Sequence, residues 1–204
     1  RDFEWLWGES SRFVNVGCPA CDLVWGKPTW LKHGFSWTRC LRCETVYMTP
    51  RPDAELLDEY YQRSEAYAYW NEVIFPASEE ARRDIFTERA QRIARRATGT
   101  LVDVGAGFGT FCEEASHLFD VVAVEPEPHL AATCRAKGIT TIEEPVERAD
   151  LLPADVVTAF EVIEHLFSPR DFVRTCAGLL PTGGLLILTC PNVKGFEVEA
   201  LGIR

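Results

Sequence analysis

The chain has 204 residues, of which 47% are hydrophobic, 25% charged and 11% aromatic, and it carries a formal net charge of −10 at pH 7. This length and apolar content fit one ordinary domain, or a small module with one incomplete domain, and they exclude intrinsic disorder and a disulfide-stapled miniprotein. No apolar run reaches the roughly 18 residues of a membrane helix and no signal peptide opens the chain, so we expect a cytoplasmic protein without a membrane partner.

The first predicted element is a metal-binding module over residues 14–48. Its two C-x2-C pairs, 18 residues apart, are formed by Cys18, Cys21, Cys40 and Cys43. Two such knuckles make the closed, tetrahedral four-thiolate site that is typical of structural zinc, and its lack of an open coordination position excludes catalysis by the ion. Iron also accepts four thiolates, whereas disulfides would require an oxidising compartment. The other four cysteines are expected to be small buried apolar residues.

Residues 49–98 are predicted to form a helical connector. Asp53 can cap a first helix on which leucine and tyrosine recur at helical spacing, and an irregular aromatic stretch follows. A second helix is predicted to begin at Ser78 and to end at Gly99. Its many arginines form either the solvated face of an amphipathic helix or a contact for an anionic substrate.

From residue 99 onwards, predicted strands and helices alternate. Apolar strands are predicted at 100–104, 121–124, 139–142, 155–160 and 185–188, with helices at 111–119 and 128–137 and from 168 to about 180. Near-continuous apolar strands that alternate with helices predict an α/β fold, in which helices cover both faces of a parallel sheet.

The carboxyl end of the first of these strands reads DVGAGFG over residues 103–109. Its glycines permit a sharp turn and a close approach of a ligand to the backbone, and the next helix offers free N–H groups. Glu125 ends the second strand, where a carboxylate can accept hydrogen bonds from both hydroxyls of a ribose. These features predict a site for a nucleoside-containing cofactor. The G-x-G-x-G spacing disfavours the dinucleotide of a dehydrogenase, which has G-x-G-x-x-G.

The glycine turn resembles motif I of the class I S-adenosylmethionine-dependent methyltransferases. The resemblance extends over residues 100–192 and includes VAVEP at 122–126, DVVTAFEVIEHL at 155–166 and LLPTGGLLILTCPN at 179–192, where Pro181 stands one place earlier than in the family pattern. The four-cysteine module, followed by Pro-Arg-Pro, is similar to that of bacterial members with an N-terminal zinc ribbon. The resemblance implies a Rossmann-like methyltransferase sheet preceded by a small zinc-ribbon module.

The resemblance also implies which residues bind S-adenosylmethionine. They are Asp103, Gly105, Ala106, Gly107, Gly109, Glu125, Pro126, Pro145, Val146 and Phe160. The glycine turn, ordered by Asp103, would line the methionyl end, and Glu125 would accept hydrogen bonds from the ribose hydroxyls. The segment around Pro145 would contact the adenine, where Glu144 or Glu147 would replace an acidic or serine residue of the family. Phe160 would close over the methionyl group.

Methyl transfer also requires a base beside the acceptor atom. His165 is the candidate, because imidazole titrates near neutral pH and this residue follows the fourth strand. The alternative is that His165 only anchors the start of a helix. Glu161 and Glu164 would orient the imidazole or bind a substrate hydroxyl. The remaining histidines, at positions 33, 117 and 129, are expected to be surface or packing residues.

The function that the resemblance implies is methyl transfer to a small-molecule acceptor, such as a sugar, a nucleotide-sugar or another metabolite. Residues 101–204 hold 7 Lys and Arg against 16 Asp and Glu, a net charge of about −9, which disfavours nucleic acid as a partner. Methylation of tRNA or rRNA with the ribbon as an RNA platform therefore stays an alternative. A further alternative is a catalytically inactive binding module whose ribbon recruits a partner.

The end of the chain bears on the predicted domain at 99–204. In the family, an antiparallel hairpin follows the fifth strand and helps to wall the acceptor site. The fifth predicted strand ends at residue 188, the chain ends at Arg204, and position 1 is not a methionine. We therefore expect a C-terminally incomplete methyltransferase domain that belongs to a longer protein.

Overall fold

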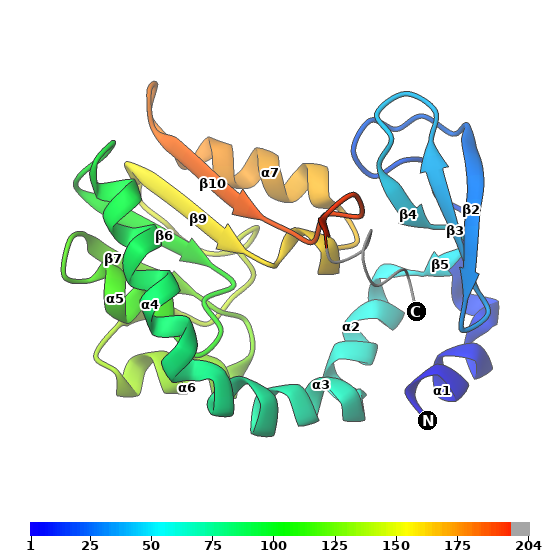
Figure 1. The fold of residues 1–204 in the computed structure, drawn as a ribbon, viewed down its shortest axis with the longest axis horizontal. Helices are drawn as coiled ribbons and strands as arrows, with labels where there is room; N and C mark the ends of the chain where they lie inside the picture. The colour runs from blue at the N-terminus through cyan, green and yellow to red at the C-terminus, as the bar shows by residue number, and fades with distance from the viewer. Residues whose placement is uncertain (197–204) are drawn as a thin grey trace. The chain divides into compact units, whose positions relative to one another are not determined.

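The computed structural model describes residues 1–196, which divide into two compact units (Figure 1). The N-terminal unit comprises Arg1–Ala77 and Phe167–Arg170, and the sheet unit comprises Ser78–Leu166 and the residues from Asp171 onwards. The end of the predicted methyltransferase domain, 197–204, lies outside the described residues. Within residues 1–196, no helix combines the length and the apolar character needed to cross a membrane.

The N-terminal unit contains a three-stranded antiparallel sheet in the order β2-β3-β4. Its elements are, in chain order, α1 (Asp2–Gly8), the 3-10 helix η1 (Ser10–Arg12), β1 (Phe13–Val14), β2 (Gly26–Lys32), β3 (Phe35–Cys40), β4 (Val46–Met48), β5 (Arg51–Pro52), α2 (Ala54–Arg63), α3 (Glu65–Tyr69) and the π-helix η2 (Trp70–Ile74). The short strands β1 and β5 pair separately. At the β2–β3 hairpin, Gly34 has a φ of +87°, and a Cβ there would lie 2.7 Å from the Trp7 ring, so only glycine fits this turn.

The aromatic stretch after α2 is helical rather than irregular. The Ser64 hydroxyl accepts the N–H of Tyr67 at 3.0 Å and caps α3. The carboxylate of Asp2 accepts the N–H groups of Glu65 and Ala66 at 3.1 and 3.0 Å at the same helix start. Three donors of the first turn are thus satisfied, two of them by a residue far away in the sequence, which stabilises a helix that the local pattern does not reveal.

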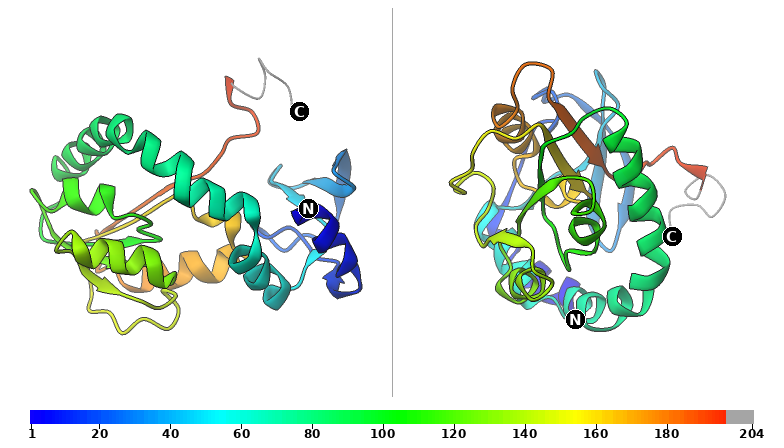
Figure 2. Two further views of the ribbon diagram at one scale, coloured as in Figure 1. Left: turned by 90° about the horizontal axis from the view of Figure 1, so that it is seen from below. Right: turned by 90° about the vertical axis from the view of Figure 1, so that its left-hand side faces the viewer.

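The sheet unit is a five-stranded parallel sheet in the order β10-β9-β6-β7-β8 (Figures 1 and 2). Its elements are, in chain order, α4 (Phe75–Ala94), β6 (Thr100–Val104), α5 (Thr110–Ala115), β7 (Asp120–Val124), α6 (Pro128–Ala136), β8 (Thr140–Ile142), β9 (Val156–Phe160), the 3-10 helix η3 (Ile163–His165), α7 (Pro169–Gly178) and β10 (Leu185–Thr189). Two of these helices, α4 and α7, begin in the N-terminal unit. The predicted α/β fold is confirmed.

Neighbouring residues of the central strand β6 point to opposite faces of the sheet. Leu101 packs in a cluster with Ile93 of α4 and Phe111 of α5, whereas Val102 packs in a cluster with Phe172 of α7. This alternation explains why the strands read as continuous apolar runs. Helix α5 is shorter than predicted, because the chain tightens after Ala115: its carbonyl accepts the N–H of Leu118, only three residues further on, at 2.9 Å, and β7 begins at Asp120.

Candidate cofactor site and four-cysteine site

The glycine turn lies at the carboxyl end of β6. Gly105, Gly107 and Gly109 have φ values of 73°, 56° and 71°, a region that favours glycine. The N–H of Gly105 donates to the carbonyl of Val124 at 2.8 Å and holds the turn beside the end of β7. A Cβ at Gly105 would lie 2.5 Å from a methyl of Val162, whereas a Cβ at Gly107 would meet nothing within 4 Å. The turn is therefore tightly packed at Gly105 and open at Gly107.

Glu125 stands beside this turn and is only 6% exposed. Its Oε2 accepts the N–H of Gly107 at 2.8 Å, and its Oε1 accepts the N–H of Glu127 at 3.0 Å. Burial raises the pKa of Glu125 to about 7, against the opposing effect of these two backbone donors. Each carboxylate oxygen retains a further lone pair, so Glu125 can still accept hydrogen bonds from hydroxyl groups.

The Asp103 carboxylate is buried behind the turn. Its Oδ1 accepts the hydroxyl of Thr158 at 2.6 Å, and its Oδ2 accepts the thiol of Cys112 at 3.3 Å. Burial raises its pKa to about 6, although both donors oppose the shift. Asp103 therefore joins β6 to β9 and α5, and Thr158 and Cys112 are two partners that the sequence analysis missed. The alternation of strand residues could have indicated Thr158, because it lies on the same face as Asp103.

A second cysteine supports the turn from α6. The thiol of Cys134 donates to the carbonyl of Gly107 at 3.2 Å, and a Cβ on Gly109 would lie 2.9 Å from its sulfur. Ala106 packs against the cluster that contains both Cys134 and Cys112. Both cysteines are buried as expected, and so is Cys176, whereas the expectation is wrong for Cys190, which is exposed. Cys112 and Cys134 also hydrogen-bond to residues of the predicted cofactor site.

The residues predicted to contact adenine differ in their exposure. Pro126 is exposed and Pro145 is half-buried, whereas Val146 belongs to the core cluster on the α7 face of the sheet. Glu144 is paired with Arg148 at 3.3 Å, and Glu147 is exposed. Their roles in cofactor binding stay predictions.

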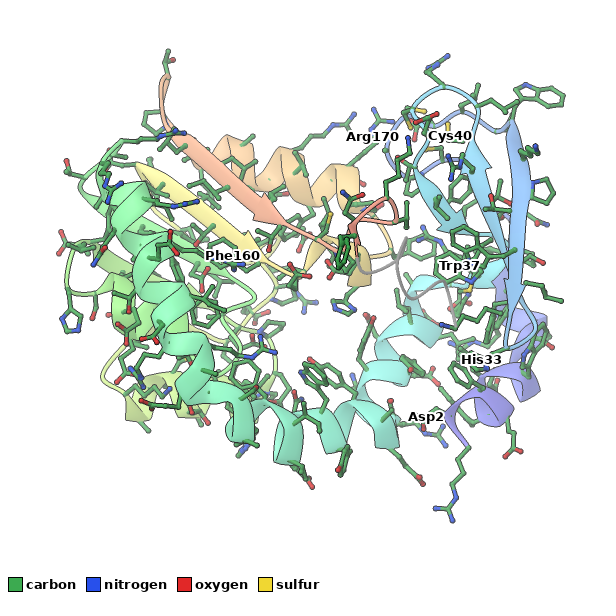
Figure 3. The ribbon with its side chains drawn as sticks, in the orientation of Figure 1. Asp2, His33, Trp37, Cys40, Phe160 and Arg170 are labelled. Atoms are coloured by element: carbon green, nitrogen blue, oxygen red, sulfur yellow. The ribbon has the colours of Figure 1, made fainter. Side chains whose placement is uncertain are left out.

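Phe160, at the end of β9, packs against α4 and α5 (Figure 3). Its ring meets Phe111 edge-on at a centroid distance of 4.7 Å and lies 6.5 Å from Phe86. The Arg89 guanidinium lies 4.8 Å from the same ring centroid. The predicted role of Phe160 over the methionyl group stays a prediction.

The candidate acceptor residues follow β9. Glu161 has a φ of 56°, an uncommon conformation for a residue with a side chain, and its N–H donates to the carbonyl of Thr189 at 3.0 Å. Glu164 and His165 lie on η3, with Oε1 and Nε2 3.9 Å apart. Burial lowers the pKa of His165 and raises that of Glu164. A neutral imidazole beside a carboxyl group can accept a proton at neutral pH.

The other histidines lie elsewhere. His33 stacks on Phe3 at a centroid distance of 4.4 Å, and His117 and His129 are exposed. Their expected surface or packing positions are confirmed for residues 33, 117 and 129.

Ion pairs engage Arg83 and Glu79 in the first half of α4. Arg83 pairs with Glu114 at 2.5 Å and with Glu113 at 3.1 Å, both on α5. Glu79 accepts the hydroxyl of Thr110 at 2.9 Å and pairs with Lys137 at 2.6 Å. Thr110 directly follows the glycine turn, so this network fixes the start of α5 against α4, a feature that the sequence analysis missed.

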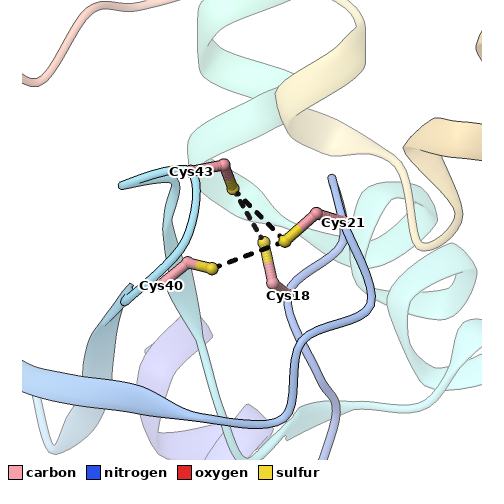
Figure 4. A group of neighbouring side chains, drawn as sticks. All are labelled: Cys18, Cys21, Cys40 and Cys43. Atoms are coloured by element: carbon pink, nitrogen blue, oxygen red, sulfur yellow. Dashed lines mark hydrogen bonds between the residues drawn. The ribbon is translucent and has the colours of Figure 1, made fainter.

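The four cysteines of the N-terminal unit converge on one point (Figure 4). Three of the separations between their sulfur atoms are 3.5 Å, and all four sulfurs lie within 4.8 Å of one another. Sulfurs held at about 2.3 Å from a tetrahedral zinc ion are about 3.8 Å apart, so the geometry fits this ion. The separations are too long for disulfide bonds. Cys18 and Cys40 are buried, Cys21 is half-buried and Cys43 is exposed.

Comparisons with known proteins agree with this geometry. Residues 78–202 match the family model of the methyltransferase domain. The ubiquinone biosynthesis O-methyltransferase of a Caulobacter species is 40% identical over 114 residues, which are 50% of this chain and 45% of that protein. The protein of the same name from Bradyrhizobium diazoefficiens is 32% identical over 120 residues, which are 50% and 44% of the two chains. The chain thus spans about half the length of the curated relatives it matches.

Solved methyltransferase structures share the fold. The structure of SAM-bound CalS10, an amino pentose methyltransferase from Micromonospora echinaspora, has a TM-score of 0.53 and 27% identity, and the likeness covers 58% of this chain and 56% of that chain. The plantazolicin methyltransferase BpumL in complex with SAH has a TM-score of 0.53 and 14% identity, over 72% and 62% of the two chains. The second likeness concerns the fold alone.

Proposed function

Because the chain belongs to the methyltransferase domain family, we propose that it transfers the methyl group of S-adenosylmethionine to a small-molecule acceptor. The observation that carries the proposal is the adjacency of the open glycine turn and the buried Glu125 at the carboxyl ends of β6 and β7. The relatives named above include an O-methyltransferase and an amino pentose methyltransferase. We therefore take the acceptor to carry a hydroxyl or amino group, as a sugar, a nucleotide-sugar or another metabolite does.

The glycine turn and Glu125 bind different parts of the cofactor in this proposal. S-adenosylmethionine supplies an electrophilic methyl group on its sulfonium sulfur when it is bound. The open side of Gly107 admits a ligand close to the backbone, and the ionised carboxylate of Glu125 accepts hydrogen bonds from ribose hydroxyls. The thiol of Cys134 and the carbonyl of Val124 hold the turn, and Asp103 ties the strand before it to Thr158, so the shape of the turn is formed before a ligand binds.

On the acceptor side, neutral His165 takes the proton that the hydroxyl or amino group loses. Burial keeps the imidazole unprotonated at neutral pH, and Glu164 orients it from a distance of 3.9 Å. Glu161 binds a substrate hydroxyl. Replacing His165 by alanine should lower kcat about 100-fold or more while the affinity for S-adenosylmethionine stays unchanged. His129→Ala is the matched control, because His129 is exposed on α6.

Cys18, Cys21, Cys40 and Cys43 bind a structural zinc ion in this proposal. The four sulfurs complete a closed tetrahedral set, and no coordination position remains for water. Zinc therefore orders the N-terminal unit and takes no part in methyl transfer.

Calorimetric titration of the zinc-loaded full chain tests the proposed function. S-adenosylmethionine and its demethylated product should each bind with one-to-one stoichiometry, and NAD⁺ should not bind. Glu125→Gln should weaken both interactions, because an amide accepts fewer hydrogen bonds from the ribose than a carboxylate. Glu127→Gln serves as the control, since Glu127 caps α6 and its N–H remains available to Glu125. A folded chain that binds NAD⁺, or that binds no S-adenosylmethionine, contradicts the proposal.

A further inference from the structure

Arg51 lies in a tightly constrained part of the N-terminal unit. It forms β5 with Pro52, and its backbone pairs with Val14 of β1. Prolines stand on both sides of it, at positions 50 and 52, and each restricts the backbone. Asp53 donates its N–H to the carbonyl of Arg12 at 3.1 Å, which continues the pairing. The side chain of Arg51 therefore starts from a fixed backbone position.

The guanidinium of Arg51 is held by one residue. Its Nη2 donates to the carbonyl of Phe167 at 2.6 Å, and its central carbon lies 4.3 Å from the centroid of the Phe167 ring. The buried Nε has no hydrogen-bond partner among residues 1–196. Arginine has five N–H donors, and a single hydrogen bond to Phe167 uses one of them. Most of the hydrogen-bonding capacity of this side chain is thus unused within the described part of the chain.

Two other arginines of the same unit pair with carboxylates. Arg12 pairs with Asp53, Glu55 and Glu59 at 3.6, 3.8 and 3.0 Å. Arg170, three residues after Phe167, pairs with Asp22. In residues 1–196, Arg51 forms no such pair, and its burial lowers the pKa of its guanidinium. A half-buried cation without a counter-ion destabilises the fold, because it loses contact with water and gains no opposite charge. A bound anion would offset this cost.

We propose that Arg51 is the binding residue of an anion site in the N-terminal unit, which takes a phosphate or carboxylate group of a small molecule. The planar guanidinium can bind two oxygens of one such group at once, a geometry that lysine lacks. The Phe167 ring and carbonyl hold the guanidinium in one orientation, so little freedom is lost when the anion binds. The site requires neither S-adenosylmethionine nor methyl transfer, and it goes beyond the proposed function.

Calorimetric titration of the zinc-loaded full chain with pyrophosphate, inorganic phosphate and succinate tests the site. The wild-type chain should bind at least one of them at millimolar concentration. Arg51→Met should weaken that binding about 10-fold or more, because it removes a charge-assisted pair of hydrogen bonds. Arg51→Lys should give an intermediate loss of affinity, since lysine keeps the positive charge but cannot bind two oxygens of one group at once. Arg63→Met is the matched control: Arg63 is exposed and lies over the Trp5 ring at 4.5 Å.

The probes distinguish a phosphate from a carboxylate ligand, and the variants distinguish a loss of binding from a loss of folding. Binding of the phosphates alone assigns a phosphate group to the ligand, and binding of succinate alone assigns a carboxylate. Zinc content and near-UV circular dichroism establish that each variant is folded, and Arg51→Lys decides the question if Arg51→Met does not fold. Wild-type affinity in both Arg51 variants, or no binding of any probe by the wild-type chain, overturns the proposal. Titration of the same samples with S-adenosylmethionine reports on the proposed function separately.

Discussion

In the N-terminal unit, buried residues gather around sulfur atoms and aromatic rings, whereas in the sheet unit they gather on both faces of a parallel sheet. The N-terminal clusters are small and consist of Leu6, Phe35 and Leu56 and of Cys18, Cys40 and Tyr47. The sheet unit buries longer runs of valine, leucine and alanine together with Phe111 and Phe172. We infer that the first unit depends on the zinc ion proposed for its four cysteines, and that the second depends on apolar packing.

Removal of zinc should give the largest difference in stability between the two units. A chelator, or Cys40→Ser, should unfold the N-terminal unit, because a structural four-cysteine zinc contributes about 10–16 kcal/mol to folding. All six tryptophans precede residue 78, so their fluorescence reports on this unit alone. The sheet unit should retain its circular dichroism and its affinity for S-adenosylmethionine. The matched control is Cys190→Ser, which replaces an exposed cysteine outside the cluster. Tryptophan fluorescence that does not change when zinc is removed would contradict the dependence of the N-terminal fold on metal.

A substitution that creates a cavity in the sheet unit should destabilise that unit and leave the N-terminal unit unchanged. Phe172 is 2% exposed in the cluster beneath α7, and Phe172→Ala should reduce the free energy of unfolding of this unit by about 3–5 kcal/mol. Urea unfolding followed by hydrogen exchange in β6 and β9 measures this loss, while the transition in tryptophan fluorescence should not move. Phe196→Ala removes the same side chain at 82% exposure and should change little. Equal shifts of both transitions would show that the units unfold together.

The glycine turn tests whether packing in the sheet unit also shapes the cofactor site. Gly105→Ala places a Cβ 2.5 Å from Val162 at a φ of +73°, and we expect a loss on the order of 1–3 kcal/mol in the free energy of S-adenosylmethionine binding. Gly138→Ala is the control, because Gly138 has a similar φ of +79° but a Cβ there would meet nothing within 4 Å. Calorimetry should give wild-type affinity for that control. Unchanged affinity in Gly105→Ala would mean that the turn does not bind the cofactor.

The smallest expected effect concerns a helix cap in the N-terminal unit. The Asp53 carboxylate accepts the N–H of Leu56 at 2.8 Å at the start of α2. Asp53→Ala should reduce the free energy of unfolding by about 1 kcal/mol, as seen in the tryptophan transition. Asp53→Asn keeps the cap and loses only the ion pair with Arg12, so it should cost less. Equal losses in the two variants would assign the effect to the ion pair.

Local patterns predicted much of the fold. The cysteine spacing indicated the cluster, and the apolar runs indicated all five parallel strands, because both signals lie within a few neighbouring residues. Helix α3 was missed, because the carboxylate that helps to cap it belongs to Asp2. The aromatic residues that follow Ser64 break the helical periodicity, so the local Ser64 cap was not recognised without the contact from Asp2.

For the candidate site as well, local sequence features were predicted and contacts between separate elements were not. The DVGAGFG turn and Glu125 were predicted from order and spacing, and the structure brings Gly107 and Glu125 into hydrogen-bond contact. The partners of Asp103 and the isolation of Arg51 were not predicted, because both depend on which side chains meet across separate elements. A sequence shows that an arginine is present, but not that no carboxylate of residues 1–196 pairs with it.

The pH dependence of S-adenosylmethionine affinity tests the central claim most directly, namely that buried Glu125 binds the ribose of this cofactor. The pKa of Glu125 is raised to about 7, so below that pH the carboxyl is mainly protonated and accepts ribose hydrogen bonds poorly. Affinity measured by calorimetry should therefore increase about 10-fold between pH 6 and pH 8 and level off above the pKa, and Glu125→Gln should abolish most of this increase. Equal pH dependence in the wild-type chain and Glu125→Gln, or no binding at any pH, would contradict it.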